Sequence, residues 1–406
     1  MNMPERFPPN AITLRYPELG TGPVSTEPCR STAYFELERE HIFKKSWLNV
    51  GRDEDAPNPG DYFVIDLDIL QASLIIVRGQ DGKVRAFHNA CCHRGNKVAS
   101  KSSGHAKDFV CGFHGWTYGT EGQLTHVPDE DQFFNFNKAD YALRAVHCDV
   151  WEGFIFINVA EKPKETLAEW VGEFKGTLAG YPFQDMYRVG LYRARVKANW
   201  KIIVDAFQEG YHVAFVHGRS IPNAFTGKQN PFCHISAVDL YKRNRRGSIY
   251  ANPNHKPAGA EAVAMGCGAT LTQGSSADMS SLPIGVNPER KFEWGFDFNV
   301  IFPNFRFDPG QGWYFADNFW PVSVDESIYE IALYMPKPRT ASERISQEYT
   351  RVLLRDAVTE DLSTLESCQR AIMSGAMPTF VLSDMEVAIR HQYHVVDKMI
   401  REEMGK

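Results

Sequence analysis

The chain has 406 residues, of which 43% are hydrophobic and 23% charged, so it is long enough for two or three globular domains. Its formal net charge of −6 argues against a general attraction to nucleic acid or to anionic membranes. The sequence shows no signal-peptide pattern and no apolar run of membrane-spanning length, so we expect a soluble, cytoplasmic protein. Its eight cysteines are mostly scattered singly, which favours a reducing compartment over a disulfide framework.

The segment from about Trp47 to Val159 is rich in β-branched and aromatic runs of strand length. Between two of these runs, Gln80-Asp81-Gly82 is a hairpin turn signal. The segment therefore predicts a small antiparallel domain with loops between its strands. Its clearest predicted strands are Asp61–Asp66, Ala72–Arg78 and Gly153–Val159.

Two of the predicted loops each offer one thiolate and one imidazole. Cys91 and His93 are spaced C-x-H, and Cys111 and His114 are spaced C-x2-H. Two cysteines and two histidines divided in this way are the ligand set of a Rieske 2Fe–2S cluster, in which one iron takes both sulfurs and the other both nitrogens. Zinc is the main alternative, but it usually groups the cysteines in one knuckle and the histidines in another. We therefore predict a Rieske cluster, with Cys92 a small residue that is no fifth ligand.

Beyond this domain the sequence predicts alternating helices and strands. In chain order these are a helix over 163–175, a strand over 187–198, a helix over 200–215, aromatic strands between 292 and 335, and two long helices over 342–373 and 382–404. The segment 253–288 is rich in Gly, Ala and Ser and predicts a long loop, either a lid over a pocket or an exposed connection. This order predicts an α+β fold.

A second candidate site lies in the predicted helix that follows Asn199-Trp200-Lys201. Glu209 and His212 share a helical face, whereas five ideal helical steps separate His212 from His217 by about 140°. For both histidines to bind one metal, the helix must end or bulge between them; otherwise they are ordinary polar residues of a helix. Two histidines and one carboxylate would leave iron(II) with open positions for dioxygen. The residues alone leave that carboxylate open among Glu360, Asp361 and Glu366, or leave these as a solvated acidic helix face.

Together these motifs resemble the catalytic α subunit of Rieske non-heme iron oxygenases, which comprise ring-hydroxylating dioxygenases and related demethylating monooxygenases. The resemblance follows the family's order over nearly the whole chain, from the C-x-H-R-G and C-x2-H-G-W loops to a late D-x4-E-x2-Q helix. It implies an antiparallel β Rieske domain and a helix-grip (START/Bet v 1-like) catalytic domain. The implied divisions are an N-terminal segment, 1–44, that packs on the catalytic domain, the Rieske domain, 45–165, and the catalytic mononuclear iron domain, 166–406.

The resemblance also implies a role for each matching position. Glu209 takes the place of the family's catalytic bridging carboxylate, often Asp, which links a cluster histidine of one subunit, here His114, to an iron-bound histidine of its neighbour, here His212. The implied assembly is a head-to-tail homotrimer, with or without a small β subunit. Ala206 departs from the Asn common near this point and implies a less polar space beside the iron. The implied cluster ligands are Cys91, His93, Cys111 and His114, and the implied iron ligands are His212, His217 and Asp361.

In function, the resemblance implies the terminal oxygenase of a multicomponent system. It would use O2, and electrons from a ferredoxin or ferredoxin reductase supplied by NAD(P)H, to hydroxylate or dihydroxylate an aromatic or bulky hydrophobic substrate, as in aromatic hydrocarbon catabolism. Oxidative dealkylation is the alternative within the family. Two alternatives lie outside the family. One is a helix-grip ligand-binding protein with a structural zinc, and the other is a pure electron carrier. The expected substrate pocket comprises Val204, Phe207, Gln208, Phe215 and inward-facing aromatic residues of 292–320.

Two basic groups are candidates for docking an acidic electron donor. Arg94, Lys97 and Lys101 lie beside the first cluster motif, and residues 242–246 form a basic run. A solvated basic turn is the alternative interpretation of the second group.

Overall fold

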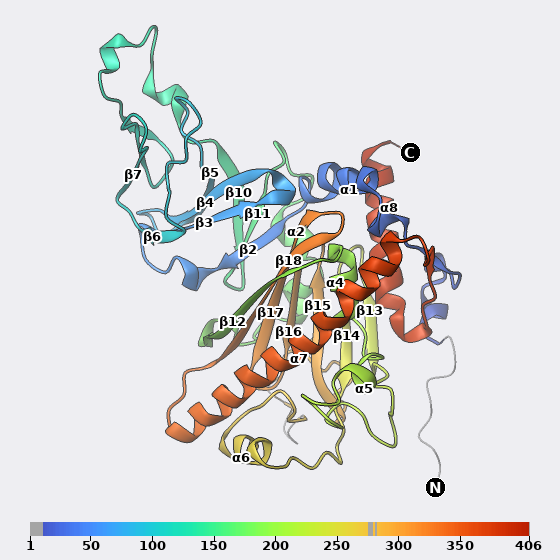
Figure 1. Cartoon of the computed structure of the whole chain (residues 1–406). Helices are drawn as coiled ribbons and strands as arrows, with labels where there is room; N and C mark the ends of the chain where they lie inside the picture. The colour runs from blue at the N-terminus through green and yellow to red at the C-terminus, as the bar shows by residue number, and fades with distance from the viewer. Residues whose placement is uncertain (1–10, 275–278, 281, 406) are drawn as a thin grey trace. The chain divides into compact units, whose positions relative to one another are not determined.

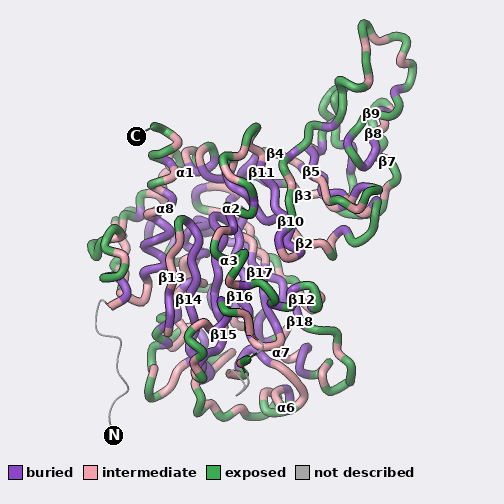
Figure 2. The backbone as a smooth tube through the Cα atoms, turned by 180° about the vertical axis from the view of Figure 1, so that it is seen from behind, coloured by how far each residue is buried: buried purple, intermediate pink, exposed green. Residues whose placement is uncertain are grey.

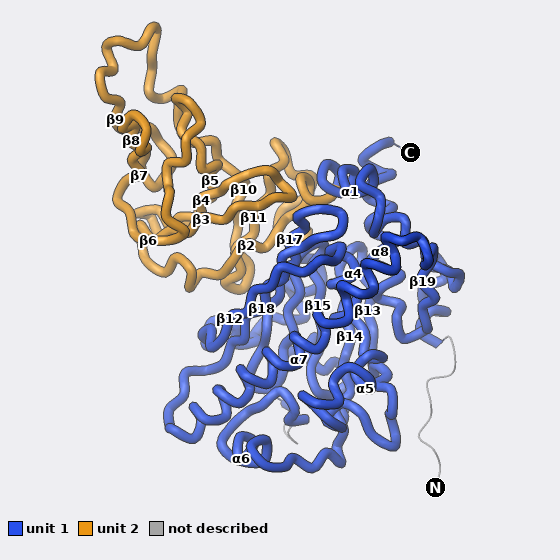
Figure 3. The backbone as a smooth tube through the Cα atoms, viewed as in Figure 1, with its two compact units in different colours: residues 1–41, 171–406 blue, residues 42–170 orange. Residues whose placement is uncertain are grey.

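The computed structural model describes residues 11–274, 279–280 and 282–405. Its backbone forms two compact units, one of residues 42–170 and one of the described residues of 1–41 and 171–406 (Figure 3). Helices and antiparallel sheets are mixed along the chain, which confirms the predicted α+β fold. Within the described residues, the helices lack the combination of length and apolar character that a membrane crossing requires.

The unit of residues 42–170 is built on a seven-stranded antiparallel sheet in the order β2-β11-β10-β5-β4-β3-β6, with a three-stranded sheet β7-β8-β9 (Figure 3). The three clearest predicted strands are confirmed as β3, β4 and β11. Gly82 has the positive φ, 78°, that the predicted hairpin turn between β4 and β5 requires. The strands are β2 Leu48–Arg52, β3 Asp61–Leu67, β4 Ala72–Arg78, β5 Val84–His88, β6 Ser103–His105, β7 Asp108–Val110, β8 Thr117–Gly119, β9 Leu124–His126, β10 Ala145–Trp151 and β11 Phe154–Asn158.

The other unit contains a seven-stranded antiparallel sheet in the order β12-β18-β17-β16-β15-β14-β13. The long helix α7 crosses one face of this sheet (Figure 1), and α4 packs against α7, β17 and β18. The central strands are almost wholly buried (Figure 2), because aromatic side chains such as Trp294, Phe298 and Phe307 fill the space on the sheet. The strands are β12 Met186–Val196, β13 Ala237–Leu240, β14 Arg245–Tyr250, β15 Trp294–Ile301, β16 Phe305–Pro309, β17 Tyr314–Ser323 and β18 Glu326–Pro336, with a small pair, β1 Val24–Ser25 and β19 Thr379–Phe380.

Two predicted helices are each divided in the structure. Residues 163–175 form two short helices with Gly172 between them, in a left-handed conformation with φ 61°. Residues 200–215 form α4 and α5 with a non-helical segment between them, and the predicted loop over 253–288 contains the helix α6. Periodicity identified the buried faces correctly but not the points where the helices end. The helices are α1 Thr32–Glu38, α2 Leu167–Val171, α3 Phe174–Thr177, α4 Trp200–Ala206, α5 Val213–Val216, α6 Ala260–Cys267, α7 Ala341–Met373 and α8 Val387–Glu403.

Helix α4 is fixed at its first turn by buried polar contacts. The side chain of Asn199 caps the helix by accepting from the N–H of Lys201, 3.1 Å away. The Lys201 ammonium donates to the Glu38 carboxylate at 2.5 Å, and both side chains are fully buried. Trp200 donates its indole N–H to the other oxygen of Glu38 at 3.0 Å. These bonds join α4 to α1. They therefore fix the position from which the following segment, 205–217, continues.

We expect Lys201→Met to lower the free energy of unfolding by about 3–5 kcal/mol, because it leaves the Glu38 carboxylate buried without its cation. Guanidinium unfolding followed by tryptophan fluorescence measures this change. Lys398→Met is the matched control, since Lys398 is exposed and lies 4.0 Å from Glu402; it should change little. Equal effects of the two substitutions would show that the buried pair does not anchor α4.

Candidate functional site

The two loops with the Cys and His motifs share one backbone design. In the first, the carbonyl of Cys91 accepts a hydrogen bond from the N–H of Gly95 at 2.9 Å, and in the second the carbonyl of Cys111 accepts from Gly115, also at 2.9 Å. Both glycines have positive φ, 79° and 71°, a conformation that glycine adopts without steric cost. Each cysteine therefore begins a tight turn that a glycine closes.

These turns bring the four predicted cluster ligands together in the unit of residues 42–170. Cys91 and Cys111 are buried in one apolar core. The rings of His93 and His114 lie 4.6 Å apart, centre to centre. The Nδ1 atom of His93 is buried and has no hydrogen-bond partner among the residues that the structure describes. Two thiols, two imidazoles and an orphaned ring nitrogen fit a Rieske 2Fe–2S cluster.

Neighbouring side chains hold this group in place. Trp116 stacks on His93 with ring centres 5.0 Å apart and planes inclined by 9°. The hydroxyl of Tyr118 lies 3.3 Å from Cys91 Sγ and accepts the backbone N–H of Cys92 at 2.9 Å. The Cys92 thiol donates to a backbone carbonyl 3.2 Å away, so it is engaged outside the group. Burial, together with His114, lowers the pKa of His93, which favours the neutral imidazole that metals bind.

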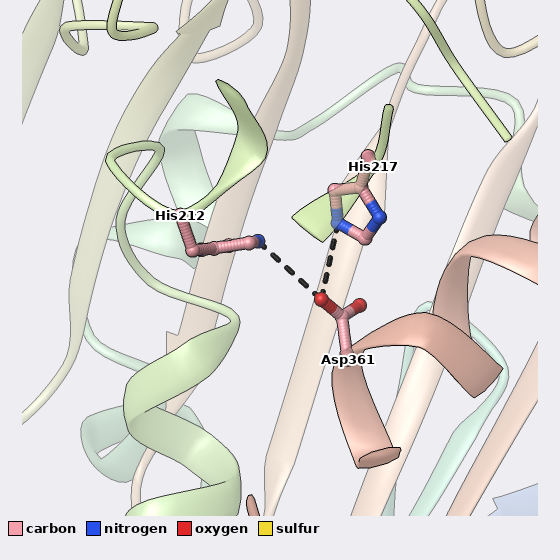
Figure 4. Close-up of side chains that lie close together, drawn as sticks. All are labelled: His212, His217 and Asp361. Carbon is pink, nitrogen blue, oxygen red and sulfur yellow. Dashed lines mark ion pairs between the residues drawn. The ribbon is translucent and has the colours of Figure 1, made fainter. Parts of the chain in front are cut away.

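A second group lies in the other unit. His212, His217 and Asp361 each offer a ligand atom, and these atoms lie within 4.8 Å of one another. Figure 4 shows both histidines pointing toward the Asp361 carboxylate, whose Oδ1 lies 3.0 Å from Nε2 of His217 and 3.5 Å from Nε2 of His212. Two imidazoles and one carboxylate on one side of a common point fit iron(II) with open positions.

The single turn of α5 explains how two histidines five residues apart reach one carboxylate. His212 is the N-cap of this helix and His217 is its C-cap, so the helix ends on both sides as a shared metal requires. Gly210 lies in the preceding non-helical segment and packs closely on Cys233. A Cβ at position 210 would lie 2.3 Å from the Cys233 carbonyl oxygen, so glycine is needed to place His212 where it is.

Each histidine is held on its other ring nitrogen by a glutamate. Nδ1 of His212 hydrogen-bonds to Glu209, and Nδ1 of His217 lies 3.0 Å from Oε2 of Glu360. Burial lowers the pKa of His212, but the carboxylates of Glu209 and Asp361 outweigh it and raise the pKa overall. With both Nδ1 atoms bound to carboxylates, both Nε2 atoms are directed to Asp361, which is the tautomer and orientation that a metal at this point needs.

The structure separates the three acidic candidates on α7. Asp361 faces both histidines. Glu360 supports His217 instead and accepts the Ser220 hydroxyl at 2.5 Å. Glu366 accepts the backbone N–H of Lys197 at 3.1 Å and is not part of the group. Sequence reasoning missed the role of Glu360, because adjacent residues on a helix point about 100° apart and nothing in the spacing shows that both directions meet His217.

A cavity opens beside the His212, His217 and Asp361 side chains, and most of its wall is apolar. Four phenylalanines line it, from the C-cap of α4, the segment after α5, β15 and β17. Ala206 also lies in the wall, where the resemblance implied a less polar space. The lining residues are Ala206, Phe207, Glu209, His212, Val213, His217, Ile221, Phe225, Ile249, Leu271, Phe296, Arg306, Phe315, Ile331, Leu354, Ala357, Val358 and Asp361.

Of the four expected pocket residues, only Phe207 lines this cavity. Val204 is fully buried on α4 and lies in the core. Gln208 hydrogen-bonds to the Arg245 side chain and is buried in a polar network. Phe215 is 68% exposed on α5. These three side chains lie away from the cavity because the chain leaves the helix after Ala206, so that a continuous helical face does not extend from Val204 to Phe215. Among the aromatic residues of 292–320, Phe296 and Phe315 line the cavity.

A buried ionic group on β16 and β17 adds a strongly polar element to the sheet wall of the cavity. Arg306 donates from Nε to Asp308 at 2.8 Å, and its Nη1 lies 3.1 Å from Asp317, its cross-strand neighbour. The guanidinium lies over the rings of Phe207 and Phe315, 4.8 and 5.2 Å from their centres. Burial raises the pKa of Asp308 to about 6 and that of Asp317 to about 8. An alternation of charged and aromatic residues in 305–308 was the sequence signal for this group.

Most of the basic run over 242–246 is buried, and Lys242 is its one exposed residue. Arg245 and Arg246 have exposures of 0% and 1%. Arg246 donates to Asp297 and Asp239, and Arg245 donates to Gln208. Arg245 and Arg246 therefore belong to the interior of the sheet, whose strand β14 begins at Arg245.

Comparisons with known proteins agree with this geometry. Residues 183–402 match the model of the ring hydroxylating alpha subunit (catalytic domain), and residues 46–142 match that of the Rieske [2Fe-2S] domain. The carnitine monooxygenase oxygenase subunit of Acinetobacter pittii (strain PHEA-2) is 33% identical over 190 residues, 46% of this chain and 50% of that protein. The large oxygenase component of the naphthalene 1,2-dioxygenase system of Pseudomonas aeruginosa is 32% identical over 199 residues, 46% of this chain and 42% of that protein.

The chain thus spans about half the length of the curated relatives that it matches. Among solved structures, a quaternary ammonium Rieske monooxygenase in complex with an inhibitor aligns with a TM-score of 0.75 at 21% identity, over 96% of this chain and 98% of that one. This likeness shows the shared fold.

We expect Asp361→Ala to remove the mononuclear iron and to leave the Rieske cluster in place, because the substitution deletes one of three ligands in one unit only. The iron content of reconstituted protein should fall from about three to about two atoms per chain, while the visible spectrum of the cluster is unchanged. Glu366→Ala is the matched control on the same helix and should keep about three. Full retention of iron in Asp361→Ala would exclude Asp361 as a ligand.

Proposed function

The chain belongs to the family of ring-hydroxylating α subunits, and we propose that it is the terminal oxygenase component of a multicomponent Rieske system. The observation that carries this proposal is the presence of two separate ligand groups in one chain, one of two cysteines and two histidines and one of two histidines and a carboxylate. When bound, a 2Fe–2S cluster supplies single electrons and iron(II) supplies open positions for dioxygen. The electrons would come from a ferredoxin or a ferredoxin reductase.

The residues around the second group have distinct tasks in this proposal. His212, His217 and Asp361 hold the iron, and Glu209 and Glu360 keep the two imidazoles in the required tautomer. The phenylalanines and aliphatic residues of the cavity exclude water and receive the apolar part of a substrate. We assign the cluster domain to residues 45–165, with Cys91, His93, Cys111 and His114 as its ligands, and the catalytic domain to 166–406. Of the segment 1–44, the described residues 11–41 lie in the same compact unit as the catalytic sheet.

We propose further that Glu209 is the link between neighbouring copies in a homotrimer. Its carboxylate holds His212 and is 9% exposed. Exposed aromatic rings lie beside it in the chain: Tyr211 is 50% and Phe215 68% exposed, and their ring centres lie 6.1 Å apart. An exposed apolar surface next to a buried carboxylate favours a protein partner at this place. The partner that we propose is the cluster loop of a second copy, which presents His114.

Two reactions on two different classes of substrate are candidates for this cavity. The apolar cavity with four phenylalanine rings supports hydroxylation of an aromatic or other bulky apolar compound. The alternative, oxidative cleavage of a quaternary ammonium compound, is supported by the relatives, which include carnitine and glycine betaine monooxygenases. We favour the first, because the Arg306 guanidinium already lies over Phe207 and Phe315. A quaternary ammonium group would compete for those ring faces with a cation built into the wall.

A single-turnover experiment distinguishes the two reactions without requiring the natural electron donor. Holoprotein reduced with dithionite and freed of excess reductant is mixed with oxygenated buffer and naphthalene, 2-naphthoate, carnitine or glycine betaine. We expect hydroxylated arenes of up to about one per chain and no trimethylamine from carnitine. Trimethylamine without hydroxylated arene would establish the alternative reaction. The absence of every product from fully loaded protein would contradict the proposed oxygenase function.

For the link between copies, we expect Glu209→Gln to keep both metals bound and to lower turnover by about 10- to 100-fold, because a neutral amide no longer anchors His212 toward a neighbouring cluster. Iron analysis and steady-state oxygen consumption measure the two properties separately. Glu360→Gln is the matched control, since it alters the support of His217 without touching Glu209; it should weaken iron binding more than it slows the loaded protein. Normal turnover in Glu209→Gln would remove Glu209 from the pathway.

A further inference from the structure

The two histidines of the cluster group differ in how well they are covered. His93 is half-buried, whereas His114 is exposed. Trp116 stacks on the ring of His93, and Phe133 meets the same ring edge-on, with ring centres 5.8 Å apart. The ring of Phe113 lies against His114, but this phenylalanine is itself 54% exposed. Aromatic rings therefore enclose one of the two imidazoles and leave the other open to solvent.

A second row of rings supports this enclosure. The ring centre of Phe136 lies 5.4 Å from those of both Trp116 and Phe133. Tyr141 stacks on Phe136, with planes inclined by 15°. We call these four residues, Trp116, Phe133, Phe136 and Tyr141, the aromatic cover. Phe134 follows Phe133 directly in the chain but is 96% exposed, so it offers a matched position outside the cover.

The segment that provides most of the cover is attached to the cluster loop itself. It leaves the apolar core of its unit after Val127 and returns to it at Leu143, and both residues are buried. Just before the return, the carbonyl of Ala142 accepts a hydrogen bond from the Cys92 thiol at 3.2 Å. Cys92 is the residue that precedes His93 in the first cluster motif. The hydrogen bond therefore ties the covering segment to the loop that carries the covered histidine.

Apolar rings beside a redox centre affect it in two ways. Reduction of a cluster adds one negative charge, and a charge is less stable beside apolar rings than in water, so enclosure lowers the reduction potential. Rings also keep water and small molecules away from the metal. The second effect matters in the presence of oxygen, because a reduced cluster that meets O2 can pass it one electron. That step gives superoxide and an oxidised cluster.

We propose that the aromatic cover directs the electron of the cluster out through His114 and protects the reduced cluster from dioxygen on the side of His93. Its members are positioning residues, since they act on the cluster through the histidine that they enclose. The inference goes beyond the proposed function and depends only on the Rieske domain, which residues 46–142 match. It requires no particular substrate at the second ligand group.

A redox titration of the holoprotein tests the proposal with Phe133→Ser, which opens the cover to water, and Phe134→Ser, its matched control. At a fixed applied potential, the ratio of reduced to oxidised cluster should rise about tenfold in Phe133→Ser, or about 59 mV for a one-electron couple. Phe134→Ser should leave the ratio unchanged, and Phe133→Leu, which stays apolar, should retain most of the original potential. Visible circular dichroism follows the cluster. An unchanged potential in Phe133→Ser, or an equal shift in Phe134→Ser, would overturn the proposal.

Two further measurements distinguish access from a general loosening of the domain. Pulsed electron paramagnetic resonance of the reduced cluster in D2O should show additional deuterium coupling in Phe133→Ser and none in Phe134→Ser. Reduced Phe133→Ser should also release superoxide faster than Phe134→Ser in oxygenated buffer. Its higher potential alone would slow that reaction, so the acceleration reports access. No additional coupling, or equal rates of superoxide release, would refute the cover.

Phe136→Ser provides the same test one ring further from the histidine. It should shift the potential in the same direction as Phe133→Ser but by less, and it decides the question if Phe133→Ser does not bind the cluster. A potential in Phe136→Ser equal to that of Phe134→Ser would then count against the proposal. None of these measurements uses a substrate, so a negative result would leave the proposed oxygenase function untouched.

Discussion

The geometry of the catalytic unit depends on one carboxylate. Asp361 Oδ1 lies 3.0 Å from a nitrogen of His217 and 3.5 Å from a nitrogen of His212, and these residues are brought together from helices more than a hundred positions apart in the chain. This arrangement requires α7 to cross the sheet at the point where Asp361 can face both histidines. It also requires α4 to end before His212 and the single turn of α5 to follow. The buried Lys201–Glu38 pair fixes the start of α4, and Gly210 fixes the loop that follows. Each of these features is a structural requirement of the three-residue group.

The carboxylates around the group are arranged in two layers. Asp361 faces the point that both histidines share, while Glu209 and Glu360 each hold the far nitrogen of one ring. This arrangement is nearly symmetric about Asp361, but the two glutamates differ in their surroundings. Glu360 accepts a second bond from Ser220 inside the unit, whereas Glu209 lies next to exposed aromatic residues. The difference fits a purely supporting role for Glu360 and a supporting and linking role for Glu209.

Much of this could be predicted from the sequence, and the failures have physical causes. The Cys and His spacings predicted which four residues the two similar turns bring together. The alternation of aromatic with other residues predicted the aromatic strands. The helical pattern after Trp200 predicted a buried face but not its end, because a close contact between Gly210 and Cys233, distant in sequence, sets that end. Val204, Gln208 and Phe215 therefore lie away from the cavity, and Phe207 is the one of the four expected pocket residues that lines it. The choice among Glu360, Asp361 and Glu366 came from family resemblance, since helical spacing alone does not show where α7 meets His217.

The central claim is that this polypeptide binds two separate iron centres, one in each unit. The most direct measurement is electron paramagnetic resonance of anaerobically reconstituted protein after addition of dithionite, combined with metal analysis. We expect an S = 1/2 signal of a reduced Rieske cluster and about three iron atoms per chain. A colourless protein that gives no such signal and contains zinc in place of iron would contradict it.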